Sequence, residues 1–270
     1  MLIVFYIFGI ASIRDQSSIS KNENMMLGIR RSDRDSDANS PDPMLNGEHL
    51  FAERFVPKCR TVFDVGARTD DYLVRLNQDC DFHLFEPMSE SFQQLQQKVT
   101  GNSRVRAVNT ALGNEKGEVL IHPDTQSIHK RPHGESTPTT IVIQTLDEYC
   151  QQAEVESIDF MKIDVEGYEL DVLRGGEGMI RNHVRTIQFE YGGTYQEVGI
   201  SLGEVFEFLG DGWSIYRVCP KGLVEVAGYS PQLENYQYAN FVASRERLDD
   251  YLAPANSLLK QIIRQLTSAA

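Results

Sequence analysis

The densest group of chemically active side chains lies in one segment, SIDFMKIDVEGYELDVLRGG, at residues 157–176. Lys162, Asp164, Glu166 and Glu169 flank Gly167 there. Carboxylates can accept a proton from a substrate, and a paired lysine lowers the pKa of an acid. The apolar residues before Asp164 predict a buried strand, and the run after it predicts a helix that ends at two glycines. The acids therefore follow a buried strand, where open α/β sheets bind ligands.

Two further acids follow predicted strands earlier in the chain. Asp64 and Gly66 end the run TVFDVG, and Glu86 ends the run FHLFEP, 86 − 64 = 22 residues after Asp64. A carboxylate at the end of the second strand can bind both ribose hydroxyls of an adenosyl group. Asp64 would face a cationic amino-acid tail or a sulfonium. The alternative for Glu86 is a simple helix cap, although Pro87 and Ser89 already shape that turn.

The turn after the first strand narrows the class of ligand. It reads GARTDD and lacks the GxGxxG of dinucleotide sites, and no Walker GKS or GKT occurs in the chain. Without these glycines a pyrophosphate cannot approach the backbone closely. Among dinucleotides, phosphate-activated nucleotides and S-adenosylmethionine, the pattern favours S-adenosylmethionine.

The elements that carry these residues alternate between strands and helices. Apolar and β-branched runs predict strands over 61–66, 82–87, 105–112, 158–165 and 186–190. Helical spacing predicts helices over 50–55, 70–77, 90–99, 145–150, 168–176 and 201–209, with Ser89 as the cap of the third. This order is typical of consecutive βαβ units, and an antiparallel pair over 213–219 and 240–244 would close the sheet.

Residues 113–142 interrupt this alternation. Two short β runs around a polar loop over 124–138 predict a hairpin excursion with its tip near the substrate entrance. His122, His129 and His133 fall in this excursion, and we interpret them as solvated loop residues. We predict no metal site, because the four cysteines show no CxxC or Cys/His ligand spacing and indicate free thiols in a reducing compartment.

The two ends of the chain differ from its central part. Residues 1–13 are apolar but too few to span a bilayer as a helix, and no basic segment precedes them. Residues 14–43 are polar and show no apolar period. We therefore expect an apolar segment and disordered leader over 1–44 and one cytoplasmic domain over 45–270, without membrane association. A terminal helix, interrupted near Pro254, is predicted over 245–266.

The charge balance limits the partners. The formal net charge of -13 argues against a nucleic acid, because phosphate binding needs a concentrated basic surface. It also makes a strongly anionic acceptor unfavourable through general repulsion. The hydrophobic content of 41% is ordinary for a globular domain with a sizeable core.

Five segments together carry a resemblance to a known family. Residues 62–190 contain, in this order, VFDVGA, HLFEP, VNTALGNEKGEVLIH, QTLDEY and IDFMKIDVEGYELDVLRGG. The series resembles the FkbM-type methyltransferases, S-adenosylmethionine-dependent enzymes that methylate hydroxyls on sugars and polyketide-type products. KIDVEGYE and FEP are specific in combination, whereas either alone is a weak signal.

The resemblance implies a Rossmann-like α/β fold: a seven-strand methyltransferase sheet, mostly parallel with an antiparallel closing strand, and helices on both faces. It implies S-adenosyl-L-methionine as the cofactor, with its methionine end at Asp64 and Gly66, its ribose at Glu86 and its adenine near 109–111. The full set of predicted cofactor-binding residues is Asp64, Gly66, Ala67, Arg68, Glu86, Pro87, Asn109, Thr110 and Ala111. Asp164 and Glu166 would lie beside the transferred methyl, and the acceptor would be a hydroxyl of a small molecule or glycan.

At the first turn the chain departs from the family pattern. The family shows DVGANxGxxS where this chain has DVGARTDDY, so Arg68 replaces an asparagine and Asp70 a glycine. The Asp70 side chain would crowd the cofactor carboxylate or change the turn, whereas Arg68 could pair with that carboxylate. This turn supports one alternative, a binding or scaffold protein that keeps the fold without catalysis. A nicotinamide-dependent oxidoreductase is a second alternative. The absence of the GxGxxG glycines argues against it.

Methyl transfer from a sulfonium is a direct displacement, so the enzyme needs alignment and, for a hydroxyl, a base. We hypothesise that Asp164 or Glu166 takes the acceptor proton, or holds a water or metal that does. Glu190, at the end of the neighbouring strand, would position the acceptor. Lys162 lies on the same strand face as Asp164 and would pair with it and lower its pKa. For Glu169 we prefer a simpler interpretation, a charge in the first helical turn that the helix dipole favours.

Overall fold

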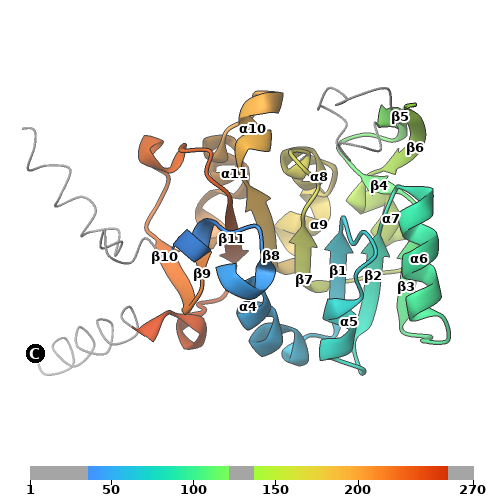
Figure 1. Cartoon of the computed structure of the whole chain (residues 1–270), viewed down its shortest axis with the longest axis horizontal. Helices are drawn as coiled ribbons and strands as arrows, with labels where there is room; N and C mark the ends of the chain where they lie inside the picture. The colour runs from blue at the N-terminus through green and yellow to red at the C-terminus, as the bar shows by residue number, and fades with distance from the viewer. Residues whose placement is uncertain (1–35, 122–136, 255–270) are drawn as a thin grey trace, which may run out of the picture. The chain divides into compact units, whose positions relative to one another are not determined.

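An eight-stranded sheet organises the part of the chain that this computed structural model describes, residues 36–121 and 137–254 (Figure 1). Its strand order is β10-β9-β11-β8-β7-β1-β2-β3. The strands are β1 Thr61–Val65, β2 Asp81–Phe85, β3 Val105–Val108, β7 Ile158–Ile163, β8 Val184–Tyr191, β9 Ser214–Cys219, β10 Gly222–Val226 and β11 Ala239–Ser244. Strands β3, β2, β1, β7 and β8 run parallel, and β11 lies antiparallel between β8 and β9. The predicted fold class is confirmed.

Strand β10 makes the sheet one strand wider than the seven that the family resemblance implies. It pairs antiparallel with β9, with Leu223 opposite Val218. Both side chains are buried, so the short apolar run GLVEV is held by the edge of the sheet. This strand was not among those predicted from the sequence.

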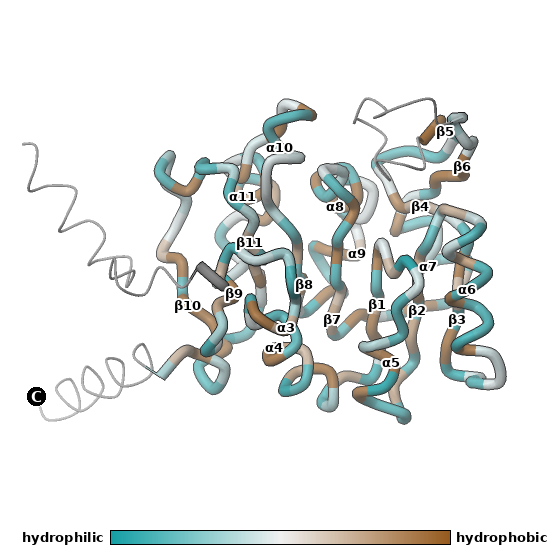
Figure 2. Tube along the Cα trace, in the orientation of Figure 1, coloured by the Kyte–Doolittle hydropathy of each residue, from teal (hydrophilic) through white to brown (hydrophobic). Residues whose placement is uncertain are grey.

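Helices cover both faces of the sheet, as expected. One face packs against α4 Glu48–Phe55, α5 Tyr72–Leu76 and α6 Ser89–Val99. The other packs against α7 Leu146–Ala153, α8 Glu169–Gly175, α9 Glu177–Asn182, α10 Gly193–Val198 and α11 Leu202–Leu209. Because successive strand residues point to opposite faces, the neighbours Val62 and Phe63 belong to different cores, and both are fully buried. The hydrophobic stretches of β1, β2 and β7 lie between these layers (Figure 2).

A second, three-stranded sheet forms the hairpin excursion above the carboxyl ends of β2 and β3 (Figure 1). It contains β4 Ala111–Leu112, β5 Gly117–Ile121 and β6 Thr139–Gln144 in the order β4-β6-β5. The antiparallel β5–β6 pair confirms the predicted hairpin. Its tip, with His122, His129 and His133, lies outside the described residues.

The single strand predicted over 105–112 is wrong. Strand β3 ends at Val108, and β4 begins three residues later in the other sheet. The break occurs because the Asn109 amide donates to the carbonyls of Glu86 and Pro87 at 2.9 and 3.0 Å. These side-chain bonds turn the backbone out of the β2–β3 pairing.

The expected leader is folded in its last part. Residues 36–39 and 43–46 form a 3-10 helix and helix α3, Pro43–Asn46, whose first turn Asp42 caps through the Met44 amide at 2.9 Å. Asn39 bonds to Arg217 and, at 3.1 Å, to Gln237, so tertiary contacts order this polar stretch. The remainder of the leader and the apolar segment lie outside the described residues.

The terminal helix predicted over 245–266 is not present over 245–253, where the chain forms a 3-10 turn, Asp249–Tyr251, and a bridge from Leu252 to Leu223. The rest of that prediction falls outside the described residues. Within 36–121 and 137–254, no helix has the length and apolarity needed to cross a membrane.

Candidate functional site

The carboxyl ends of β1, β2, β7 and β8 meet at one edge of the sheet. The turn after β1 touches the turn after β7, because the Asp164 amide donates to the Val65 carbonyl at 3.0 Å. Gly66 has a φ of 91°, and a Cβ there would lie 2.0 Å from the Asp164 carbonyl oxygen. Only glycine fits this turn, which explains its place after the first strand.

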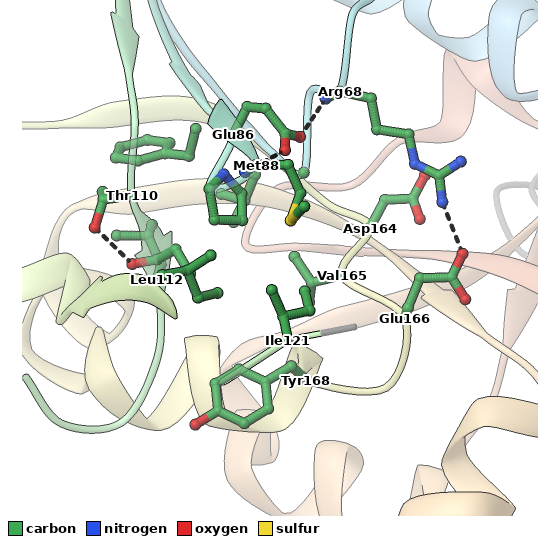
Figure 3. Close-up of a pocket in the computed structure, with 16 residues that line it drawn as sticks. Arg68, Glu86, Met88, Thr110, Leu112, Ile121, Asp164, Val165, Glu166 and Tyr168 are labelled. Atoms are coloured by element: carbon green, nitrogen blue, oxygen red, sulfur yellow. Dashed lines mark hydrogen bonds and ion pairs between the residues drawn. The ribbon is translucent and has the colours of Figure 1, made fainter. Parts of the chain in front are cut away.

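A pocket opens at this edge, and we call it the Glu86 pocket (Figure 3). Most of its wall is apolar and comes from both sheets and the turn after β7. The lining residues are Val65, Gly66, Arg68, Phe85, Glu86, Pro87, Met88, Thr110, Ala111, Leu112, Ile121, Ile141, Asp164, Val165, Glu166 and Tyr168.

Glu86 is the buried anion of this pocket. Its Oε1 accepts from the Met88 amide at 2.7 Å, and its Oε2 accepts from the Arg68 amide at 2.9 Å. Burial raises the pKa of Glu86, against the opposing effect of these two bonds. Each oxygen keeps a second lone pair, so a carboxylate held in this way can accept two further hydrogen bonds from a vicinal diol. Ser89 forms no cap, since Met88 occupies that position.

The hairpin excursion supplies the opposite wall of the Glu86 pocket. Ile121 and Ile141 face into the pocket, whereas their neighbours Leu120 and Val142 point to solvent. The Thr110 hydroxyl donates to the Val142 carbonyl at 2.9 Å and so ties the first sheet to this wall. The base of the hairpin therefore belongs to the site itself.

A second pocket lies on the other side of the β1 turn, and we call it the Lys162 pocket. Its walls come from residues 41–43, α4, α5 and the ends of β1, β7 and β8. The lining residues are Pro41, Pro43, Glu48, His49, Ala52, Asp64, Gly66, Ala67, Arg68, Asp70, Tyr72, Leu73, Phe160, Lys162, Asp164, Gln188 and Tyr238. Lys162 Nζ lies 2.9 Å from Asp164 Oδ2 and 3.5 Å from Glu48 Oε1. The predicted Lys162–Asp164 pair is confirmed.

Three polar residues complete this pocket. Asp64 is 6% exposed, and burial, with contributions from neighbouring acids, raises its pKa to about 7 even though Lys162 opposes the shift. Its Oδ1 has no hydrogen-bond partner, and neither has Nε2 of the buried Gln188. The Asp70 carboxylate accepts a hydrogen bond from the Tyr72 amide at 2.9 Å at the start of α5.

A third pocket, which we call the Glu190 pocket, lies at the ends of β7 and β8. Its lining residues are Pro41, Arg68, Asp164, Glu166, Glu190, Gly192, Gly193, Thr194, Glu197 and Tyr238. The Glu190 and Asp164 side chains are hydrogen-bonded to each other. Burial and then the Asp164 charge raise the pKa of Glu190 far above its usual range. Burial alone would also raise the pKa of Asp164, but Lys162 and these bonds outweigh it and lower the pKa. Asp164 is therefore the carboxylate of the pair and Glu190 the protonated acid.

Arg68 and Glu166 form an ion pair across the mouth of the Glu86 pocket (Figure 3). Arg68 Nη2 lies 2.8 Å from Glu166 Oε1, and both residues have left-handed backbones, with φ of 52° and 57°. Such conformations are strained for side chains other than glycine and asparagine and cluster at functional sites. Arg68 lines all three pockets, and Glu166 lines two of them.

Glu169 is more than the helix-dipole charge that the sequence suggested. Although it lies in the first turn of α8, it is 1% exposed, and Oε1 accepts from the Val165 and Gly167 amides at 3.1 and 3.3 Å. Burial raises its pKa to about 8. Glu169 thus shapes the turn that presents Asp164 and Glu166.

The structure brings most of the predicted site residues to one edge. Lys162, Asp164 and Glu190 form one cluster, and Glu166 joins it through Arg68. The predicted cofactor residues divide between the Glu86 pocket (Gly66, Arg68, Glu86, Pro87, Thr110 and Ala111) and the Lys162 pocket (Asp64 and Ala67, with Gly66 and Arg68 shared). Asn109 lines neither pocket, because its amide is bonded to the β2 turn.

Sequence reasoning missed Glu48, Gln188 and Tyr238, which line the Lys162 pocket. Gln188 lies two residues before Glu190 in a predicted strand. Side chains two apart in a strand point to the same face, so this spacing could have identified Gln188 as a site residue. Glu48 and Tyr238 come from segments without a recognisable pattern, and only packing brings them here. Among the described residues, no group of three or more His, Cys, Asp or Glu side chains has the arrangement of a metal site.

Comparisons with known proteins identify one family. The profile of the methyltransferase FkbM domain matches residues 64–229. The 2-O-methyltransferase NoeI of Sinorhizobium fredii is 24% identical over 137 residues, covering 44% of this chain and 56% of that protein. The hexuronic acid methyltransferase AglP of Haloferax volcanii is 27% identical over 135 residues, covering 47% of this chain and 53% of that protein.

The chain therefore spans about half the length of these curated relatives. Among solved structures, methyltransferase FkbM of Methylobacillus flagellatus matches with a TM-score of 0.46 and 15% identity, covering 68% of this chain and 43% of that chain.

Proposed function

The chain belongs to the FkbM methyltransferase family, and from this premise we propose that it transfers a methyl group from S-adenosylmethionine to a hydroxyl of a sugar. The names of the two relatives, a 2-O-methyltransferase and a hexuronic acid methyltransferase, support this class of acceptor. The further support comes from the chemistry of the three adjoining pockets.

The residues of the Glu86 pocket fit an adenosine. Glu86 is oriented by two backbone amides and keeps lone pairs for the two ribose hydroxyls. Apolar side chains such as Leu112, Ile121 and Ile141 offer a wall for a flat purine. S-adenosylmethionine, when bound, would supply an electrophilic methyl group on its sulfonium.

The observation that carries the proposal is the position and charge of Asp164. It is a carboxylate, and it lines the Glu86, Lys162 and Glu190 pockets alike. A base there could accept the proton of an acceptor hydroxyl while that oxygen takes the methyl group, the carbon–sulfur bond breaks and S-adenosylhomocysteine leaves. The protonated Glu190 can donate a hydrogen bond that orients the acceptor or Asp164. After transfer, the Asp164–Glu190 pair holds the extra proton until water removes it.

The charges of the Glu190 pocket also suit a polyhydroxyl acceptor. Lys162 offsets Asp164, Arg68 offsets Glu166, and Glu190 is protonated. These groups present hydrogen-bond donors and acceptors, Glu197 adds a further acid to the lining, and Tyr238 adds an aromatic ring to the wall. Sugars need this combination of polar groups and a flat apolar surface.

Calorimetry with the full chain tests the cofactor part of the proposal. We expect S-adenosylmethionine and S-adenosylhomocysteine to bind, and Glu86→Ala to weaken both by about tenfold or more, because charge-assisted hydrogen bonds to the ribose are lost. Glu90→Ala, which removes an exposed acid nearby on α6, is the control. If a folded wild-type chain binds neither ligand, the proposal is wrong.

The acceptor part needs a separate assay. The chain is incubated with radiolabelled S-adenosylmethionine and a panel of neutral sugars, amino sugars and uronic acids, and the product is analysed for an O-methyl group. Label on carbon or nitrogen, or on none of these acceptors, would contradict sugar O-methylation while leaving cofactor binding intact.

A further inference from the structure

Building on the proposed function, we infer that Glu48 is a positioning residue of the acceptor site. Through Lys162 it acts on the base Asp164. Through Asn240 it holds Tyr238 in the pocket wall. Glu48 lies on α4, 64 − 48 = 16 residues before the part of the chain that the family profile matches. The residue is therefore outside the matched family domain, and its contacts alone indicate its role.

The Glu48 side chain is buried and has a partner at each oxygen. It is 9% exposed, Oε1 lies 3.5 Å from Lys162 Nζ, and Oε2 accepts from Asn240 Nδ2 at 3.2 Å. Acids are rarely buried unless their partners compensate for the lost water. Lys162 belongs to β7 and Asn240 to β11. Glu48 is therefore held in one position between two strands of the sheet.

The contact with Lys162 affects the base. Lys162 Nζ is shared between Glu48 and Asp164, whose Oδ2 lies 2.9 Å away. The negative charge of Glu48 offsets part of the lysine charge that acts on Asp164. Beside an unshared ammonium Asp164 would be a weaker base, because the positive charge would lower its pKa further. Glu48 thus fixes the ammonium in place and preserves the basicity of Asp164.

The contact with Asn240 affects the pocket wall. Asn240 is 5% exposed, and its Nδ2 also donates to the Tyr238 hydroxyl at 3.3 Å. An amide nitrogen carries two hydrogens, so Glu48 and Tyr238 together use both. Tyr238 lines the Lys162 pocket and the Glu190 pocket. Glu48 therefore orients the amide that fixes the Tyr238 ring where an acceptor sugar would lie.

The segment before α4 holds Glu48 in place. The Glu48 amide donates to Asn46 Oδ1 at 2.8 Å, and the Asn46 amide donates to the Ser40 carbonyl at 3.1 Å. Asn46 is 2% exposed. Gly47 has a φ of 95°, and a Cβ there would lie 2.0 Å from the Cys219 carbonyl oxygen. Only glycine lets α4 begin this close to the end of β9, so this packing also fixes the Glu48 carboxylate.

Steady-state kinetics of the full chain test this role. The assay uses saturating S-adenosylmethionine and the sugar of the panel above that gives the wild type most product. Glu48→Gln keeps the shape of the side chain and an oxygen acceptor for Asn240, but it removes the charge beside Lys162. We expect kcat to fall by about threefold to tenfold, because a weaker base accepts the proton less readily, with an unchanged KM for the sugar.

Glu48→Ala removes both contacts. We expect a similar loss in kcat and, because Asn240 no longer holds Tyr238, a rise of about threefold or more in the KM for the sugar. Both variants should bind S-adenosylhomocysteine with wild-type affinity in calorimetry, which also shows that they are folded. Glu177 is the matched control, because it is an exposed acid in the first turn of α9 and pairs with Arg181 at 2.8 Å. The same two substitutions at Glu177 should change none of these values.

The outcomes separate this inference from the proposed function. If Glu48→Gln turns over at the wild-type rate, or raises the KM as much as Glu48→Ala, the positioning role is wrong and the proposed function stands. If both variants weaken S-adenosylhomocysteine binding along with kcat, Glu48 only maintains the fold and the inference is again wrong. If the wild type binds S-adenosylhomocysteine but methylates no sugar of the panel, the acceptor part of the proposed function falls and this inference falls with it.

Discussion

Asp164 and Glu190 share a hydrogen bond at the point where β7 and β8 leave the sheet. Two carboxyl groups this close cannot both be ionised in a buried site, so one keeps its proton. Lys162, 2.9 Å from Asp164, decides which one. The pair therefore offers a base and a hydrogen-bond donor side by side, and its members should respond differently to isosteric substitution.

Asp164→Asn should lower kcat at pH 7 by about 100-fold or more, since a general base contributes 10²–10⁴. The amide keeps the shape of the side chain but cannot take the acceptor proton. Methyl transfer to an identified acceptor measures the loss, and calorimetry with S-adenosylhomocysteine checks that the cofactor still binds. Wild-type turnover in this variant would remove Asp164 from the role of base.

Glu190→Gln should be much milder at neutral pH. Because the raised pKa of Glu190 keeps it protonated, a glutamine amide can replace its donor, and we expect a loss of about tenfold or less in kcat, in line with one altered hydrogen bond. The wild-type rate should fall at alkaline pH as Glu190 ionises, and this fall should be absent from the variant. Identical pH–rate profiles for the two proteins would contradict the assigned protonation.

Lys162→Met should destabilise the protein by up to about 3 kcal/mol at pH 7, because it leaves the buried Glu48 and the partly exposed Asp164 without their cation. Lys162 holds the pKa of Asp164 low, so Asp164 contributes stability that is present above its unfolded pKa and lost as pH falls. In the variant that contribution is gone, and the difference from wild type should shrink as pH falls below 3.8. Urea unfolding at several pH values measures this, with the exposed Lys221→Met as control.

Glu169→Gln should stabilise the protein progressively as pH rises. Burial raises the folded pKa of Glu169 to about 8 from 4.5 for the unperturbed side chain, so its contribution to wild-type stability is fully present below pH 4.5 and is lost as pH rises through 8. Glutamine keeps an acceptor for the Val165 and Gly167 amides and avoids this loss, which is at most about 1.4 kcal/mol per pH unit.

Urea unfolding at pH 5, 7 and 9 measures the effect of Glu169→Gln. The matched control is Glu177→Gln, which changes an exposed acid in the first turn of α9. An equal response of the two variants would mean that Glu169 acts only as a helix-dipole charge.

Local patterns were sufficient for the framework of the fold. The apolar runs before Asp64, Glu86, Asp164 and Glu190 predicted the strands that carry them, because side-chain alternation and βαβ connection rules leave few arrangements. The division of residues 105–112 between two sheets was not predictable in this way. It depends on the Asn109 amide reaching the β2 turn, a contact between distant parts of the chain.

The sequence by itself determined which acids gather at one edge of the sheet, since parallel strands place their carboxyl ends together. It also determined the Lys162–Asp164 pair, which follows from residues two apart on one strand face. Only the tertiary structure decided that Glu190 is protonated, that Glu169 is buried and that Glu48 and Gln188 join the site. These properties depend on how far each carboxyl is removed from water and on which side chains pack around it. The desolvation of a carboxyl group depends on the packing of the whole chain around it. A local sequence pattern therefore cannot predict it.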